Sequence, residues 1–365
     1  MWSERNVFQS PPQSICYPLP ARLRNDTTMK KLTLTSITFF LLLSLFGQNG
    51  LKNGNLFLLL KDKKTISLNS FENNKINELK SFSISNKSIY TTDQKARVAI
   101  LDTAKNNLTI FDINSSNQIK LTIPFDIKPK IVLLHNNNIF VGGEMGKEIL
   151  IQYNFQNEKW YRLEIPEEVL FWGKAIDDLV VNDSLLIAID NIVIPKYILF
   201  YHLNSSNRLE LSHYKELKSN GCYEEICLGR ISNEFLVLKS KTASMGGRTN
   251  HITIIKKFDF ENCFSLSTNM FDKDFHSFND FVISGEKLII ASEEKGLGVF
   301  EIKETYFDTV DNNSSFNKRI EVSNITYKAY PKQSIIKVTI IPNSDKIILT
   351  LEDNKGGLKY EIIEI

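Results

Sequence analysis

The sequence predicts an all-β protein folded as a β-propeller, with seven four-stranded blades between residue 51 and the C-terminus. Three observations lead to this prediction. Short runs rich in Val, Ile, Phe, Tyr and Thr alternate with turns rich in Asn, Asp, Ser and Gly, about 8–12 residues apart. Similar strand–turn–strand segments recur at spacings of about 45 residues or a multiple of it. The 315 residues from 51 to 365 accommodate seven such units.

No segment of this region shows a convincing helical period. The strand-like runs are, in chain order, Asn55–Leu60, Ala96–Asp102, Asn107–Asp112, Lys130–His135, Glu148–Tyr153, Lys159–Ile165, Ser184–Asp190, Tyr197–His202, Glu234–Lys239, His251–Phe258, Lys287–Ala291, Gly298–Ile302, Ile335–Ile341 and Lys346–Leu351.

Two pairs of segments carry the repeat. Leu108–Leu121 resembles Ile198–Leu211, with the same Asn-Ser-Ser-Asn turn 90 residues further on. Asp177–Ala188 resembles Asp280–Ala291, and each has a strand, a polar turn and a second strand. Because the first unit lacks an inner strand and the last stops after its third, we expect strands from both termini to close the ring. Six blades is the alternative count, and a β-sandwich or β-helix is the alternative fold.

The segment Asp280–Ile302 resembles the LVIVD-type propeller repeat of secreted and surface bacterial proteins. It has an Asp, an alternating strand, a Ser-Gly turn, an aliphatic strand ending in Ala, and a Gly-Leu pair before a third strand. The likeness is looser over Asp177–Phe200, and elsewhere only the hydrophobic rhythm is shared. The resemblance implies a repeat architecture and carries over no catalytic residues.

The N-terminal segment of the sequence predicts that the protein is exported. Residues 29–47 read as a signal peptide, with Lys30 and Lys31 before an apolar run from Leu32 to Phe46. The run is shorter than the about 20 residues that a membrane-spanning helix needs. We therefore expect a secreted or periplasmic protein without a stable membrane span after cleavage; an uncleaved anchor is the alternative. We expect residues 1–28 to be an extension that precedes the true start at Met29, or else a disordered tail.

The charge argues against nucleic acid as a partner. The whole chain has 44 basic and 42 acidic residues, but residues 1–47 hold five of the basic and two of the acidic ones. The remaining 39 basic and 40 acidic residues give a net charge of −1. No domain-scale basic surface follows from this balance. We expect a monomer that binds a protein or a glycan.

Two cysteines are candidates for a disulfide. Cys222 and Cys227 could close a small loop in an oxidising compartment, or they are free thiols. Their spacing is not that of a metal site, and the five histidines of the chain form no short ligand pair. No metal site and no cofactor is predicted, although a carboxylate at the channel could coordinate Ca²⁺.

Five residues are candidates for ligand binding. Asp178 and Asp280 begin inner strands, whose ends approach the central channel, or they cap the strand entry. Trp172 and His276 precede these strands on one rim, where an aromatic side chain could stack on a sugar or pack between blades. Arg248 follows Gly246-Gly247 in a long hairpin and could approach an anion.

The chain contains none of the motifs GxSxG, HExxH, GxGxxG and the phosphate-binding loop. We therefore predict an exported, non-catalytic scaffold that binds a protein or a glycan, with no catalytic residues. The alternatives are a hydrolase or lyase that acts on a lactone or carbohydrate at an acidic site in the channel, and a purely structural envelope component.

Overall fold

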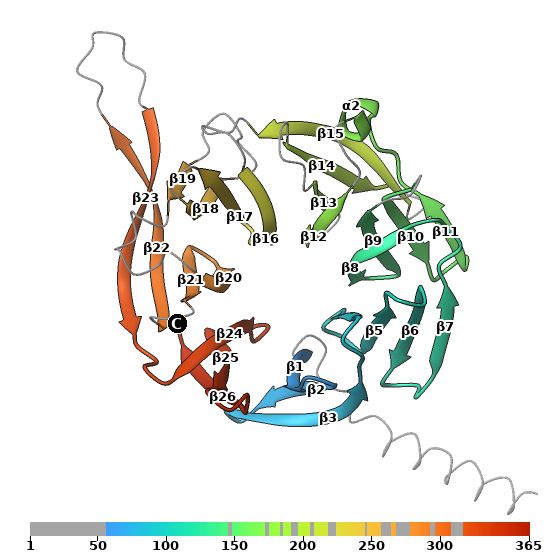
Figure 1. The fold of residues 1–365 in the computed structure, drawn as a ribbon, viewed down its shortest axis with the longest axis horizontal. Coiled ribbons are helices and arrows are strands. Elements are labelled where there is room, and N and C mark those ends of the chain that lie inside the picture. Colours follow the sequence, from blue (N-terminus) through green and yellow to red (C-terminus); the bar gives the residue numbers. More distant parts are fainter. Residues whose placement is uncertain are drawn as a thin grey trace, which may run out of the picture. The chain divides into compact units, whose positions relative to one another are not determined.

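A computed structural model describes residues 56–144, 148–171, 175–182, 185–190, 196–204, 208–217, 224–244, 247–256, 264–267, 278–292, 296–307 and 317–365. The chain divides into two units, Met1–Leu51 and Lys52–Ile365, and every described residue belongs to the second. In this second unit seven antiparallel sheets stand around a central axis (Figure 1). The predicted all-β propeller with seven blades is confirmed.

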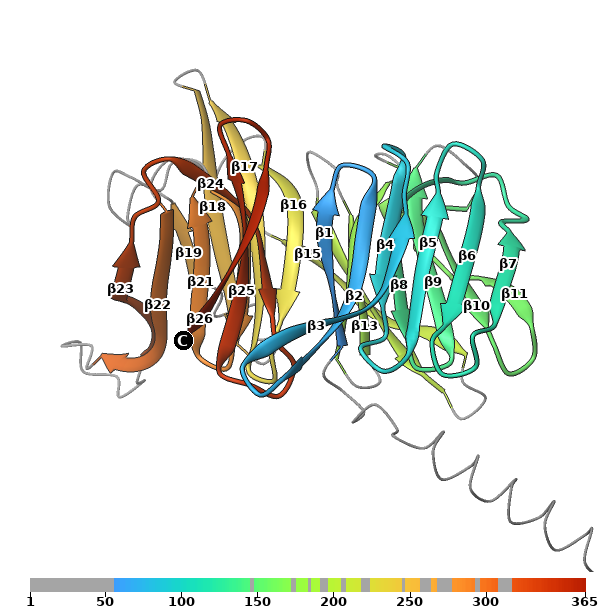
Figure 2. The same ribbon diagram turned by 90° about the horizontal axis from the view of Figure 1, so that it is seen from below.

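We number the blades in chain order, and in each blade the strands follow one another from the centre outward (Figures 1 and 2). Blade 1 consists of β1 (Leu56–Asp62), β2 (Thr65–Glu72) and β3 (Lys75–Ser83). Blade 2 consists of β4 (Ser88–Thr92), β5 (Arg97–Asp102), β6 (Asn107–Asp112) and β7 (Gln118–Thr122). Blade 3 consists of β8 (Lys128–His135), β9 (Asn138–Glu144), β10 (Leu150–Asn154) and β11 (Lys159–Arg162). Blade 4 consists of β12 (Ile176–Asn182), β13 (Leu185–Asp190), β14 (Lys196–Leu203) and β15 (Leu209–Leu217). Blade 5 consists of β16 (Glu224–Ile231), β17 (Phe235–Ser244), β18 (Gly247–Lys256) and β19 (Phe264–Ser267). Blade 6 consists of β20 (Phe278–Ser284), β21 (Lys287–Ser292), β22 (Gly296–Phe307) and β23 (Asn317–Lys328). Blade 7 consists of β24 (Gln333–Ile340), β25 (Lys346–Asp353) and β26 (Leu358–Glu364).

The second strand of each blade forms the core because neighbouring blades cover both of its faces. Leu186–Ile189 of β13 and Leu288–Ala291 of β21 are fully buried, without the alternation of a one-sided sheet. Outer strands differ: β3 and β7 are mostly exposed. One short helix, α2 (Glu167–Phe171), lies between blades 3 and 4, where the sequence showed no helical period; it follows Pro166 and buries Val169 against the blade 3–4 core.

The ring closes between blade 7 and blade 1, and each of these blades has three strands in the described part of the chain. Strands from both ends do close the ring, as two sheets that pack on each other rather than as one mixed sheet. Phe57 and Leu59 of β1 pack against Ile341 and Ile348. In the described part of the chain the last unit stops after its third strand, β26, as expected, and the first unit consists of β1, β2 and β3, with β1 packed on β25, the second strand of blade 7.

A β-bulge recurs near the start of the inner strands and positions the candidate site. The register shifts by one residue at equivalent places in five of them: Pro129/Ile131, Ile176/Asp178, Ile226/Leu228, Phe278/Asp280 and Ile335/Lys337. An extra residue at a bulge kinks the strand and redirects the side chains beside it. The bulges therefore form one level of the channel, at the end where each inner strand begins.

Candidate functional site

Asp178 and Asp280 occupy equivalent positions, directly after the bulges of β12 and β20. Both are buried. A buried carboxylate is costly unless donors surround it, so its partners decide what it can do. At both positions these partners lie on the side chain's own strand and on the inner strand of the next blade.

Asp178 connects blade 4 to blade 5. Its Oδ1 accepts a hydrogen bond from the backbone N–H of Leu179 at 3.0 Å, and its Oδ2 accepts one from the N–H of Gly229 at 2.7 Å. Gly229 also allows close approach, because a Cβ at this position would lie 2.4 Å from the Cδ1 of Ile189. Asp178 thus fastens β12 to β16.

Asp280 repeats this arrangement between blades 6 and 7. Its Oδ1 accepts from the N–H of Phe281 at 2.9 Å, and its Oδ2 accepts from the N–H of Val338 at 3.0 Å. The neighbouring Asn279 adds a bond from its Nδ2 to the carbonyl oxygen of Ile335, at 2.9 Å. Both aspartates therefore hold successive blades together through main-chain donors, which fits the strand-entry alternative.

Arg230 of β16 brings the two aspartates into one cluster. Its Nη2 donates to Oδ1 of Asp280 at 3.1 Å, and its Nη1 lies 3.8 Å from Oδ2 of Asp178. Its Nη1 also donates to the carbonyl oxygen of Gly229, and its guanidinium lies over the ring of Phe281 at 5.6 Å. One half-buried cation of blade 5 thus pairs with two buried carboxylates, one from blade 4 and one from blade 6.

Lys337 stands in blade 7 where blades 4 and 6 have Asp178 and Asp280. Burial lowers the pKa of its ammonium and the nearby Arg230 lowers it further, while the carboxylate of Asp280 raises it. The Nζ of Lys337 lies 5.6 Å from the ring centre of Tyr90, on the inner strand of blade 2. Burial raises the pKa of Tyr90, whose phenol is therefore neutral at pH 7.

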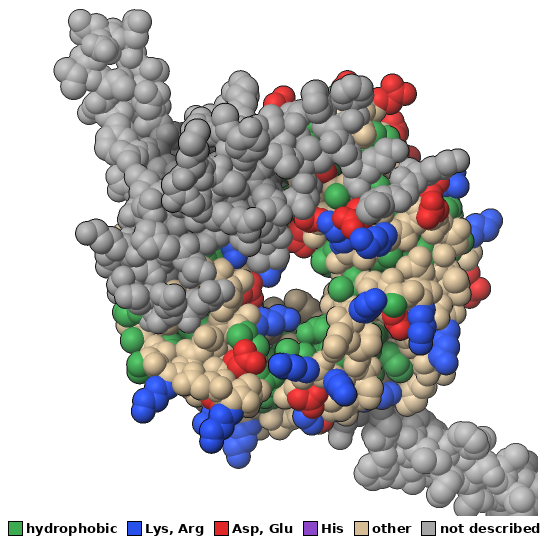
Figure 3. Space-filling model, viewed as in Figure 1, with side chains coloured by type: hydrophobic (Ala, Val, Ile, Leu, Met, Phe, Trp, Pro, Cys, Tyr) green, Lys and Arg blue, Asp and Glu red, His purple; other side chains and the backbone are tan. Residues whose placement is uncertain are grey.

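A more exposed layer of charges lies at the bulges of blades 3 and 4. Lys130, the extra residue in the bulge of β8, makes ion pairs with Asp177 of β12 at 2.9 Å and with Glu144 at 2.6 Å. Lys128 also pairs with Glu144, at 2.6 Å. In Figure 3, Lys and Arg side chains (blue) and carboxylates (red) border the central opening. We refer to Lys128, Lys130, Glu144 and Asp177 as the rim charges.

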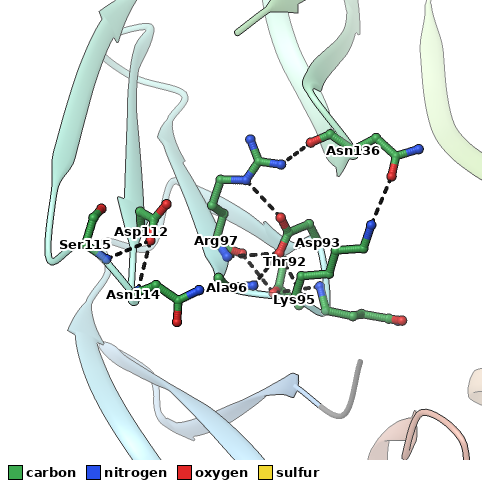
Figure 4. A network of polar contacts seen from close by, with 10 residues as sticks. Thr92, Asp93, Lys95, Ala96, Arg97, Asp112, Asn114, Ser115 and Asn136 are labelled. Atoms are coloured by element: carbon green, nitrogen blue, oxygen red, sulfur yellow. Dashed lines mark hydrogen bonds and ion pairs between the residues drawn. The ribbon is translucent and has the colours of Figure 1, made fainter. Parts of the chain in front are cut away.

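A separate polar network ties blades 2 and 3 where their inner strands end (Figure 4). Asp93, after β4, accepts hydrogen bonds from the N–H groups of Lys95, Ala96 and Arg97 and from the Arg97 side chain. Burial raises the pKa of Asp93, but these bonds outweigh it and the net pKa is lowered. Arg97 also donates to the carbonyl oxygen of Asn136. This network is a structural clasp.

The structure brings together two of the five predicted binding residues, Asp178 and Asp280, through Arg230. Trp172 and His276 lie outside the described residues, as does Cys222. Arg248 lies in β18 and Cys227 in β16, but their side chains are outside the described part. Their roles in ligand binding and in a disulfide stay predictions.

The sequence reading missed Arg230, Lys130 and Lys337. A signal was present in the repeat: aligning Asp177-Asp178 with Asn279-Asp280 and extending the alignment to the last blade places Ile336-Lys337 at the same positions. Arg230 has no such signal, because its role depends on two carboxylates that lie 52 residues before it and 50 after it.

Among the described residues no cluster of three or more His, Cys, Asp or Glu side chains could hold a metal ion. A search of the same residues finds no helix long and apolar enough to cross a membrane. Ca²⁺ binding at the channel carboxylates stays untested.

We expect the buried Asp178 to give stability an unusual pH dependence. Burial raises its pKa from 3.8 to about 6, against the lowering effects of Arg230 and of two backbone N–H groups. Between these values the folded state binds more protons than the unfolded state, so this contribution decreases by about 2 kcal/mol as the pH rises from 4 to 6. The difference in unfolding free energy between the wild type and Asp178→Asn, from urea titrations at pH 4 to 7, measures it.

The variant removes the titration, whereas carboxylates with lowered pKa values, such as Asp93 and Glu144, contribute equally to both proteins. The half-buried Asp177, changed to Asn in the same way, is the matched control. A difference that stays constant over this pH range would show that Asp178 keeps an ordinary pKa.

No protein-family model matches the sequence, and no curated protein matches it. The fold, in contrast, is common: 543 chains of solved structures match it. One is the crystal structure of a functionally unknown protein from Desulfotomaculum acetoxidans DSM 771, with 12% sequence identity and a TM-score of 0.50, over 84% of this chain and 98% of that one. This likeness extends to the fold alone, and a fold used so widely does not specify a ligand. The resemblance to LVIVD-type repeats stays a sequence-based prediction.

Proposed function

We propose that this chain is an exported, non-catalytic propeller that binds a protein or a glycan at its channel rim. One observation carries the proposal: both oxygens of Asp178 and of Asp280 accept backbone hydrogen bonds, and Arg230 pairs with both side chains. A general acid or base needs an oxygen within reach of a substrate proton. These carboxylates instead make the channel wall rigid, which suits a binding surface.

The rim charges supply the exposed part of that surface. Lys128 has 64% of its side chain exposed, and Lys130 has 32%. Because exposed ion pairs contribute little to stability, they can exchange partners at low cost. A ligand with its own charges or hydroxyl groups could therefore replace one partner of each pair without disturbing the blades beneath. Export is supported by the signal-like residues 29–47 alone.

Binding to a glycan array and to a panel of purified envelope proteins tests the proposal. We expect Lys128→Glu to weaken the binding of any ligand found by about tenfold, because it places a second carboxylate beside Glu144. The matched control is Lys159→Glu in β11 of the same blade, an exposed lysine that pairs with Asn154 at the opposite end of the sheet from the Lys128–Glu144 pair. Equal loss in both variants, or the absence of a saturable ligand, would contradict the proposal.

A hydrolase or lyase is the second candidate, favoured by one observation. Arg230 draws Asp178 and Asp280 together, and the pKa of Asp178 is raised to about 6, as is common for catalytic acids. Turnover of lactone or carbohydrate substrates that is lost in Asp178→Asn, at a temperature where the variant stays folded, would replace the scaffold proposal with this one.

A further inference from the structure

The ammonium group of Lys337 lacks a counter-ion or hydrogen-bond acceptor among the described residues. Asp178 and Asp280, at the equivalent positions, are satisfied by backbone N–H groups of the next blade. In the described part of the chain, no oxygen lies within hydrogen-bond or ion-pair distance of the Nζ of Lys337. It lies near the ring of Tyr90 and, at longer range, interacts with the charges of Asp280 and Arg230. The half-buried ammonium group of Lys337 therefore has no counter-ion within ion-pair distance among the described residues.

The same face of blade 7 has a buried hydroxyl group without a hydrogen-bond partner. Lys337 pairs across the sheet with Thr350, and Thr350 pairs with Tyr360, so their side chains form a row on one face. Thr350 is 1% exposed, and its Oγ1 has no hydrogen-bond partner in the described structure; the buried Oγ1 of Thr339 has none either. Tyr360, by contrast, donates to the carbonyl oxygen of Leu60 at 2.5 Å.

The lack of a close counter-ion at Lys337 favours an acceptor with negative charge. A buried polar group without a partner, such as the Oγ1 of Thr350, is destabilising, so such groups are uncommon without a reason. The guanidinium of Arg230 is already engaged by two carboxylates, whereas Lys337 has no close counter-ion. Oxygens of a carboxylate or phosphate group would complete the hydrogen bonds of Lys337, and the half-buried Tyr90 would give the rest of the molecule a flat apolar contact.

We propose that the channel binds a small anion through a carboxylate or phosphate group placed on Lys337, beside Tyr90. The inference deepens the proposed function, on which it rests for its ligand-binding role: it names the chemical class of ligand that the channel takes. The lowered pKa of Lys337 agrees with an ammonium group that has no close counter-ion within the fold.

Isothermal titration of the full chain with inorganic phosphate and with glucuronate tests the site, with glucose and chloride as neutral and simple-salt controls. We expect saturable binding of at least one of the two oxyanions. Phosphate alone would indicate a phosphorylated ligand, and glucuronate alone an acidic sugar or another carboxylate. Lys337→Met should weaken this binding at least tenfold, and the exposed Lys332→Met should leave it unchanged.

Circular dichroism checks that Lys337→Met is folded, and Lys337→Gln provides a second, polar variant. Binding that both variants retain, or a response to chloride equal to that to the oxyanions, would overturn the anion site, as would the absence of binding by either oxyanion. Loss of the anion site alone leaves glycan or protein binding at the rim charges in place. Anion binding without any glycan or protein ligand would remove the rim proposal and retain this one.

Discussion

Replacing Arg230 with Met should destabilise the protein by about 3 kcal/mol or more, the largest effect that we expect from one substitution in the channel. The carboxylates of Asp178 and Asp280 are only 7% and 9% exposed, and Arg230 is the cation that pairs with both. Removing one partner of a buried ion pair typically costs about 3–5 kcal/mol, because the remaining charge stays buried without compensation. Chemical unfolding of the full chain at pH 7 measures the loss.

Arg162→Met is the matched control. Arg162 also pairs with a carboxylate, that of Glu148 at 3.0 Å, but its side chain is 65% exposed. We expect that variant to lose less than about 1 kcal/mol. Arg230→Lys should fall between the two, because a single ammonium cannot reach both carboxylates in the fork geometry of a guanidinium. Equal effects of Arg230→Met and Arg162→Met would show that the cluster is not a buried charge network.

Asp280→Asn should cost about 2–4 kcal/mol although it preserves the shape of the side chain. The two oxygens of Asp280 accept from the N–H groups of Phe281 and Val338. An amide offers one oxygen, so its NH₂ group must face the other N–H, donor against donor. The loss should be local as well as global: hydrogen exchange at the Val338 amide should accelerate more than exchange at Gly229, which Asp178 holds.

Asp177→Asn provides the comparison for this second prediction. Asp177 precedes the equivalent aspartate of blade 4, but it makes a more exposed ion pair with Lys130. We expect that variant to change stability by less than about 1 kcal/mol and to leave exchange at Gly229 unaffected. If Asp280→Asn behaved like Asp177→Asn, the fastening of blade 7 by the carboxylate would be refuted.

The two results would also separate the candidate functions. A carboxylate whose removal loosens the next blade acts as a structural fastener, and its loss would reduce ligand binding only through the loosened channel. A catalytic acid would instead lose turnover while the blades stayed joined. The anion site at Lys337 is tested separately, through variants that leave Asp178, Asp280 and Arg230 in place.

The sequence by itself predicted the all-β class, the propeller and seven blades, with six as the alternative count. These depend on local periodicity and on repeats such as Asp177–Ala188 and Asp280–Ala291, which are visible along the chain. It also identified Asp178 and Asp280 as related positions. It did not identify the outer strand β3, because this strand is largely solvent-exposed and carries little hydrophobic signal.

Only the tertiary structure decided what the channel residues do. The role of Arg230 depends on two carboxylates about 50 residues away on either side, and that of Lys337 on Tyr90, which lies 247 positions earlier in the chain. Ring closure by two packed three-stranded blades is also a long-range outcome. Local propensity cannot encode such contacts, because the closure of the ring, rather than the chain itself, makes these residues neighbours.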